Sequence, residues 1–154
     1  MQYWLFKSEP SAYSYNDLVH DAVAEWDGVR NYQARNLLRD TIQVGDGVLF
    51  YHSNTDPLAV IGTATVVRSG YPDHTAWDSS SAHPDPRSTP EKPVWYMVDI
   101  QPAKRFHAPV TLNAMKTISG LENMMLLRRG ARLSIQPVTS QEWAIILSLG
   151  SAGA

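Results

Sequence analysis

The sequence predicts a mixed α+β domain, built on a small curved or closed β-barrel of about five or six strands and surrounded by short helices. Runs rich in β-branched and aromatic residues recur along the chain. Hairpin turns dominate the connections. Strands and helices do not alternate regularly, so the sequence does not predict a purely parallel sheet. With 154 residues, the chain has the size of one compact domain. We therefore expect a single domain over residues 1–150 and a frayed tail over residues 151–154.

The expected strands are short and mostly paired through turns. They cover residues 3–7, 48–53, 58–69, 94–106 and 132–138. A turn rich in Asn, Asp and Pro at 54–57 predicts that the second and third strands form an antiparallel hairpin. Residues 70–93 are rich in Pro, Ser, Asp and His and lack periodicity, which indicates a functional or a disordered loop.

The expected helices are also short. Ser14 is expected to cap a first helix that holds Leu18 and Val19. The last helix should be capped by Thr139 or Ser140 and end at Gly150. Helical patterns are expected over residues 30–39, 111–118, 121–129 and 139–150.

The segment 30–39 places polar residues on its apolar side. At about 100° per residue, the helical period, its alanine and two leucines form one side that should be buried. Arg30 falls at the centre of this side and Asn31 at its edge, directly behind Trp26 and Gly28. One interpretation is that the helix begins at a pocket and both side chains point into it. The alternative is structural: Arg30 bonds loop carbonyls and Asn31 caps the helix.

Composition disfavours several classes of protein. The net charge is −2, which argues against extended non-specific binding of nucleic acid. A local basic rim is still compatible with this net charge. The absence of cysteine excludes disulfides, thiolate metal sites and cysteine nucleophiles. No apolar run approaches the roughly 20 residues of a membrane helix, and the N-terminus does not resemble a signal peptide. We therefore expect a cytoplasmic protein.

Motifs for catalysis or metal binding do not stand out. The five histidines lack metal-ligand spacing, and there is no nucleophile elbow, phosphate loop or dinucleotide fingerprint. His52 and Ser53 are adjacent on an expected strand, so their side chains point to opposite faces and cannot form a dyad. We expect no metal and no cofactor.

Aromatic and amide side chains favour a recognition site instead. Five tryptophans and seven tyrosines exceed what a core of this size needs. Aromatic walls with a floor of Asn, Ser, His and Arg groups suit a flat polar heterocycle, which stacks by its faces and hydrogen-bonds by its edges. Stacking is worth about 1–3 kcal/mol per base, which offsets part of the few kcal/mol needed to extrude a base from a duplex.

Five ordered blocks resemble the EVE domain family: "YWLFKSEP", "W-GVRNYQARN-LR", "GD-VLFYHSN", "VWYMVDI" and "MMLLRR-ARLSIQPVT--EW". The resemblance covers residues 2–149. It implies a PUA-like β-barrel core, related to PUA, ASCH and YTH domains. YTH domains read N6-methyladenine in RNA through an aromatic cage, and EVE domains are expected to bind modified bases, particularly modified cytosines in DNA.

The resemblance also implies a set of site residues. The expected base-binding pocket consists of Phe6, Lys7, Ser8, Trp26, Val29, Arg30, Asn31, Asn36, Tyr51, His52, Ser53, Asn54 and Trp77. Independently of the resemblance, the exposed side of the segment 30–39 predicts a phosphate-facing rim of Arg35, Arg39, Arg128 and Arg129, and the alternative is a solvated charged face.

Three functional hypotheses follow. The first is a non-enzymatic reader of a modified cytosine or a methylated adenine in DNA or RNA. The second is an ASCH-like enzyme acting on a nucleic acid or a nucleotide, with His52 as the general base. The third is a small-metabolite sensor or a protein-interaction module that uses the same cavity.

Overall fold

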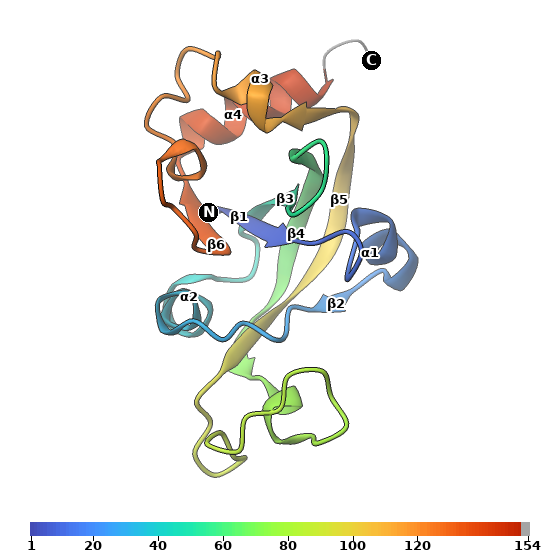
Figure 1. Ribbon diagram of the computed structural model, residues 1–154, viewed down its shortest axis with the longest axis vertical. Helices are drawn as coiled ribbons and strands as arrows, with labels where there is room; N and C mark the ends of the chain where they lie inside the picture. The colour runs from blue at the N-terminus through green and yellow to red at the C-terminus, as the bar shows by residue number, and fades with distance from the viewer. Residues whose placement is uncertain (152–154) are drawn as a thin grey trace.

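The computed structural model describes residues 1–151 and contains one mixed β-sheet with short helices around it (Figure 1). The strands are β1 (Tyr3–Ser8), β2 (Ala24–Glu25), β3 (Gly47–His52), β4 (Ala59–Pro72), β5 (Tyr96–Thr111) and β6 (Ile135–Val138). Their order in the sheet is β2-β5-β4-β3-β1-β6. Strands β1 and β3 are parallel, and the other neighbours are antiparallel.

The α+β class is confirmed, and the sheet is open. Within residues 1–151, the edge strands β2 and β6 pair with one neighbour each and not with one another. With two and four residues, they are too short to close a barrel. Strands β4 and β5 are much longer, and register shifts between them bend the sheet. The two-residue strand β2 has no counterpart among the expected strands.

The helical elements are α1 (Tyr15–Asp21), α2 (Tyr32–Asn36), α3 (Leu112–Met115) and α4 (Ser140–Ser151). A π-helical turn η1 (Leu37–Thr41) continues α2, and single 3₁₀ turns form η2 (His74–Trp77) and η3 (Met125–Leu127). The helices expected over 111–118 and 121–129 are thus shorter than the sequence pattern predicts. The helix expected over 30–39 begins two residues later.

The caps explain where the first and last helices begin. The hydroxyl of Ser14 accepts a hydrogen bond from the backbone of Asp17 at 3.1 Å, as expected. At α4, the Thr139 hydroxyl accepts from the Glu142 backbone and the Glu142 carboxylate accepts from the Thr139 backbone, which makes a capping box. Gly150 does not end α4, because the helix continues to Ser151.

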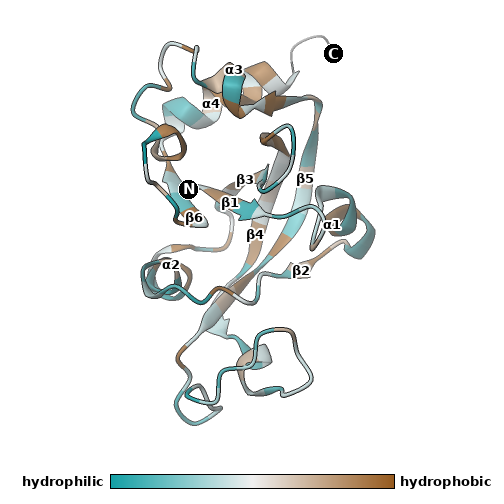
Figure 2. Cartoon of the chain, in the orientation of Figure 1, coloured by the Kyte–Doolittle hydropathy of each residue, from teal (hydrophilic) through white to brown (hydrophobic). Residues whose placement is uncertain are grey.

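The sheet carries a hydrophobic cluster on each face. Along β1, Trp4 and Phe6 belong to the cluster that α1 and α2 cover, while Leu5 belongs to the cluster beneath α3 and α4. This is the alternation expected for a strand that is buried on both faces. Figure 2 shows apolar segments along the central strands and apolar residues within the helices.

The segment 73–93 forms an ordered loop at one end of the molecule (Figure 1). Its own polar groups hold it together. The backbone of Asp85 donates to the carbonyl of Ala76 at 2.7 Å, and Ser88 is buried and accepts from the backbone of Val94 at 2.8 Å. The indole of Trp95 donates to the carboxylate of Asp85 at 2.7 Å.

Two composition-based expectations meet the structure only in part. Over residues 1–151 the longest apolar helices are too short to cross a membrane, and the expected cytoplasmic location stays a prediction. The tail expected over 151–154 begins inside α4, and residues 152–154 lie outside the described part of the chain.

Candidate functional site

A cleft of about 730 Å³ lies between the end of β1, the segment 23–30 and the loop 73–93. Five residues expected at the site line it: Lys7, Ser8, Trp26, Val29 and Arg30. The structure therefore brings the end of the first strand and the "W-GVR" block together around one opening.

Trp26 forms the aromatic wall of the cleft. Its indole packs against Phe6 with ring centroids 5.4 Å apart and edge-on against Phe50 at 5.5 Å. Tyr13 contacts it edge-on at 6.2 Å. Phe6 is fully buried and does not line the cleft, so it acts behind Trp26 and does not contact a ligand. The indole is held by core rings while part of its surface stays exposed to the cavity.

Lys7 and Ser8 bring polar groups to the floor. The Ser8 hydroxyl donates to the carbonyl of Tyr13 at 2.5 Å. Because its proton is used there, this hydroxyl can offer a ligand only acceptor lone pairs. Partial burial lowers the pKa of the Lys7 ammonium.

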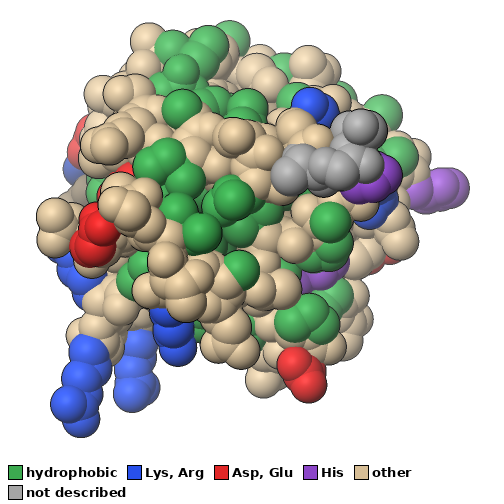
Figure 3. Space-filling view, turned by 90° about the horizontal axis from the view of Figure 1, so that it is seen from above, with side chains coloured by type: hydrophobic (Ala, Val, Ile, Leu, Met, Phe, Trp, Pro, Cys, Tyr) green, Lys and Arg blue, Asp and Glu red, His purple; other side chains and the backbone are tan. Residues whose placement is uncertain are grey.

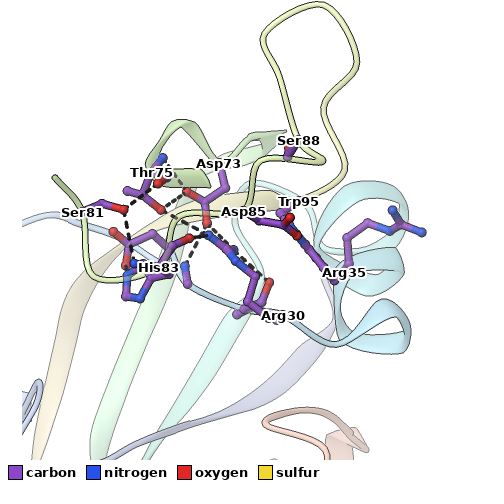
Figure 4. Close-up of polar contacts among 12 residues, drawn as sticks. Arg30, Arg35, Asp73, Thr75, Ser81, His83, Asp85, Ser88 and Trp95 are labelled. Atoms are coloured by element: carbon purple, nitrogen blue, oxygen red, sulfur yellow. Dashed lines mark hydrogen bonds and ion pairs between the residues drawn. The ribbon is translucent and has the colours of Figure 1, made fainter. Parts of the chain in front are cut away.

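Arg30 joins the cleft wall to the loop 73–93 (Figure 4). Its guanidinium donates to the buried carboxylate of Asp73 at 2.9 Å and to the carbonyl of His83 at 2.7 Å. The same Asp73 oxygen accepts from the backbone of Gly28 at 2.8 Å, and the other accepts from Thr75. Arg30 thus holds the loop against the cleft wall. This agrees with the alternative in which Arg30 bonds loop carbonyls.

Two histidines of the loop, His74 and His83, also line the cleft. The ring of His83 lies against Gly28, where an added Cβ would be 2.8 Å from the imidazole, and its Nε2 is 3.5 Å from the Asp27 carboxylate. His74 forms a 2.6 Å contact with Glu25. Neither histidine was among the expected site residues. The only signal in the sequence was that both histidines lie in the same irregular loop. Their partners lie in the segment 25–28, which is distant in the sequence, so local patterns could not place them at the cleft.

The lining carries an excess of carboxylates. Glu9, Asp21, Glu25 and Asp27 all face the cavity, against the single amine of Lys7 and the engaged guanidinium of Arg30. Burial raises the pKa of Asp27, the neighbouring Asp73 and Glu25 add to this, and His83 opposes it. The cleft therefore favours hydrogen-bond donors and disfavours anions.

The "YHSN" block lies outside this cleft. Tyr51 is buried in the cluster on the opposite face of the sheet. The Nε2 atom of His52 accepts from the backbone of Tyr15 at 3.1 Å, so the start of α1 contacts the end of β3. Ser53 and Asn54 follow that strand end and do not line the cavity.

Three further expected residues also lie elsewhere. The Asn31 side chain caps α2 by accepting from the Ala34 backbone at 3.0 Å. Asn36 is exposed and accepts from the side chain of Arg35. Trp77 is half-buried in η2 and is not part of the cleft wall.

The expected rim divides into two groups. Arg35 donates to the carbonyl of Val94 at 2.8 Å, and Arg39 pairs with Asp40 at 2.7 Å, so both are engaged within the chain. Arg128 and Arg129 are exposed and line a separate groove beside α2.

This fold and cleft define a PUA-like, EVE-type domain. The sequence matches the EVE domain over residues 2–149, and the chain belongs to this family. It is 40% identical to mouse thymocyte nuclear protein 1 over 166 residues, which is 96% of this chain and 73% of that protein.

Two solved structures are closely similar. A hypothetical protein from Leishmania major superposes with a TM-score of 0.91 at 46% identity, covering 97% of this chain and 94% of the other. The human THYN1 protein, in a complex with DNA that contains 5-methylcytosine, superposes with a TM-score of 0.90 at 37% identity over 100% of both chains.

Proposed function

We propose that this chain is a non-enzymatic module that binds a modified base of DNA in the cleft beside Trp26. The observation that carries the proposal is the indole of Trp26, which core rings hold in place while it borders a cavity of about 730 Å³. Ligand pockets are typically 300–1,000 Å³. The complex of human THYN1 with DNA that contains 5-methylcytosine supports DNA as the nucleic acid.

The polar groups of the cleft favour a base with an exocyclic amino group. Ser8 offers acceptor lone pairs, and the carboxylates of Glu25 and Asp27 accept hydrogen bonds. Cytosine and adenine present such an amino donor, whereas thymine and uracil present carbonyl acceptors at the same position. A methyl group on the base would gain apolar contact with the indole. A modified cytosine fits this description, and a methylated adenine is the alternative.

The geometry favours binding over catalysis by His52. That imidazole lies outside the cleft, and its Nε2 atom already accepts a hydrogen bond from the Tyr15 backbone. A general base must reach the proton that it removes. These contacts argue against His52 as a general base and support a non-enzymatic module.

The proposal is tested by fluorescence anisotropy with labelled oligonucleotides that differ only at one base. The probes carry 5-methylcytosine, cytosine, N6-methyladenine or adenine, each as DNA and as RNA. The wild type should prefer one modified probe over its unmodified counterpart. Trp26→Ala should weaken that preferred binding at least about fivefold, because stacking is worth about 1–3 kcal/mol per base.

Trp77→Ala is the matched control. It removes an indole that the cleft does not include, so the affinity should stay within about twofold of the wild type. The proposal is wrong if the wild type binds all probes equally. It is also wrong if Trp26→Ala and Trp77→Ala have the same effect while both variants remain folded. RNA binding or a preference for N6-methyladenine would redirect the ligand without moving the site.

A further inference from the structure

A second groove, of about 420 Å³, lies beside the start of α2. One wall is Asn31 and Gln33, and the other is the segment 128–133 between η3 and β6. Arg128, Arg129 and Arg132 all line it.

The groove continues the cleft. Arg30 lines the cleft and the next residue, Asn31, lines the groove; on the other wall, Ser134 lines the cleft and Leu133 lines the groove. Consecutive residues therefore connect the two hollows along both walls. The two hollows are therefore adjacent, and a nucleotide in the cleft has its backbone within reach of the groove.

The two hollows carry opposite charge. The cleft contains four carboxylates, whereas the lining of the groove contains three arginines and no carboxylate. Within residues 1–151, Arg129 and Arg132 make no side-chain hydrogen bond or ion pair, and Arg128 donates only to the carbonyl of Asn123. Figure 3 shows Lys and Arg side chains projecting together at the left edge, the side on which α2 and β6 lie in Figure 1.

We infer that the groove binds the backbone phosphate next to the base that occupies the cleft, so that the nucleotide is held in a single orientation. The carboxylates of the cleft repel a phosphate, and the arginines of the groove attract it and can form bidentate hydrogen bonds with it. The amide of Asn31 adds a donor, because its oxygen is used in capping α2. This inference rests on the proposed function.

The test compares the salt dependence of binding to a single-stranded oligonucleotide with one 5-methylcytosine. The double variant Arg129→Gln/Arg132→Gln should bind at least about tenfold more weakly at low salt. The slope of log affinity against log salt should become shallower by about 0.7, which is the contribution of one neutralised phosphate of a single strand. The ratio of affinities for modified and unmodified probes should stay unchanged, because the cleft is intact.

The control is Lys92→Gln/Lys116→Gln, which removes the same charge from exposed positions outside both hollows. Its slope should match that of the wild type. Equal slopes for the arginine variant and the wild type, or equal losses for both double variants, would overturn the inference. In that case the proposed function still stands if Trp26→Ala abolishes the preference for 5-methylcytosine. If the wild type shows no such preference, the proposed function fails first.

Orientation is tested with a neutral methylphosphonate linkage placed on the 5′ or the 3′ side of the modified base. Only one of the two placements should weaken binding by about tenfold, and that loss should vanish in the arginine variant. Equal losses from both placements in the wild type would contradict a single orientation.

Discussion

The guanidinium of Arg30 and the carboxylate of Asp73 are joined by a 2.9 Å ion pair in which the Asp73 side chain is fully buried. Arg30 precedes α2 and lines the cleft, whereas Asp73 precedes η2 and is not among the residues that line it. Because Asp73 also accepts from Gly28 and Thr75, this carboxylate connects the "W-GVR" segment to the start of the loop 73–93.

Asp73→Ala should destabilise the protein by about 3–5 kcal/mol, because it leaves Arg30 without its buried partner. Chemical denaturation followed by tryptophan fluorescence measures the change. The control is Asp78→Ala on the same loop, where the exposed carboxylate contacts only Ser80, and little change is expected. A similar small change for both variants would show that the loop is not held through Asp73.

The Asp73 carboxylate should also make the stability of the fold depend on pH. Burial alone would raise the pKa of Asp73, but hydrogen bonds from Thr75, Gly28 and Arg30 outweigh it and hold the pKa below its ordinary value. The stabilisation is therefore present above the unfolded pKa of about 3.9 and is lost as the pH falls through the lower folded value. The difference in melting temperature between the wild type and Asp73→Asn should shrink from pH 7 to pH 3. A constant difference over that range would contradict this role.

Gly28→Ala should displace His83 from the cleft. Gly28 has φ of +78°, and a new Cβ would lie 2.8 Å from the imidazole ring. Gly130 has the same φ of +78° with open space around the Cβ position, so Gly130→Ala carries only the backbone strain. Gly28→Ala should be at least about 1 kcal/mol more destabilising, since overpacking typically costs 1–3 kcal/mol. Equal melting temperatures of the two variants would show that His83 moves aside freely.

Protonation of His52 should reduce the stability of the fold on mild acidification. Burial and the nearby Arg105 lower the pKa of His52, and its Nε2 must be unprotonated to accept from Tyr15. This contribution is present above the unfolded pKa of about 6.5 and is lost as the pH falls through the folded value. His52→Gln keeps an acceptor that does not titrate, so its melting temperature should fall less than that of the wild type between pH 7.5 and pH 5. His107→Gln, at an exposed position on β5, should follow the wild type.

Ser8→Ala tests the polar floor of the cleft separately from its aromatic wall. It removes the acceptor that Ser8 offers and the bond to the carbonyl of Tyr13. Binding of the preferred modified probe should weaken several-fold, since a hydrogen bond contributes about 0.5–1.5 kcal/mol. Ser53→Ala, on the neighbouring strand end outside the cleft, is the control and should bind normally. Unchanged affinity for Ser8→Ala would place the base away from β1.

The sequence by itself determined five of the six strands, the first and last helix caps and the family. These depend on local patterns: alternation along β1, β-branched runs in β4 and β5, and the capping box at α4. It also placed Lys7, Ser8 and Trp26 together, because the family blocks that hold them are distinctive.

Only the tertiary structure decided what Arg30 and Asn31 do. A helical projection assigned both to a buried side, but α2 begins at Tyr32, so neither residue lies within the helix and the projection does not apply to them. The partner of Arg30 is Asp73, which lies 43 residues away and which the local sequence does not specify. Asn31 instead caps α2 through the nearby Ala34 backbone, as the structural alternative expects. Local periodicity fixes which way a side chain points within its own element, whereas a site that joins distant segments is fixed by how the sheet and loops pack.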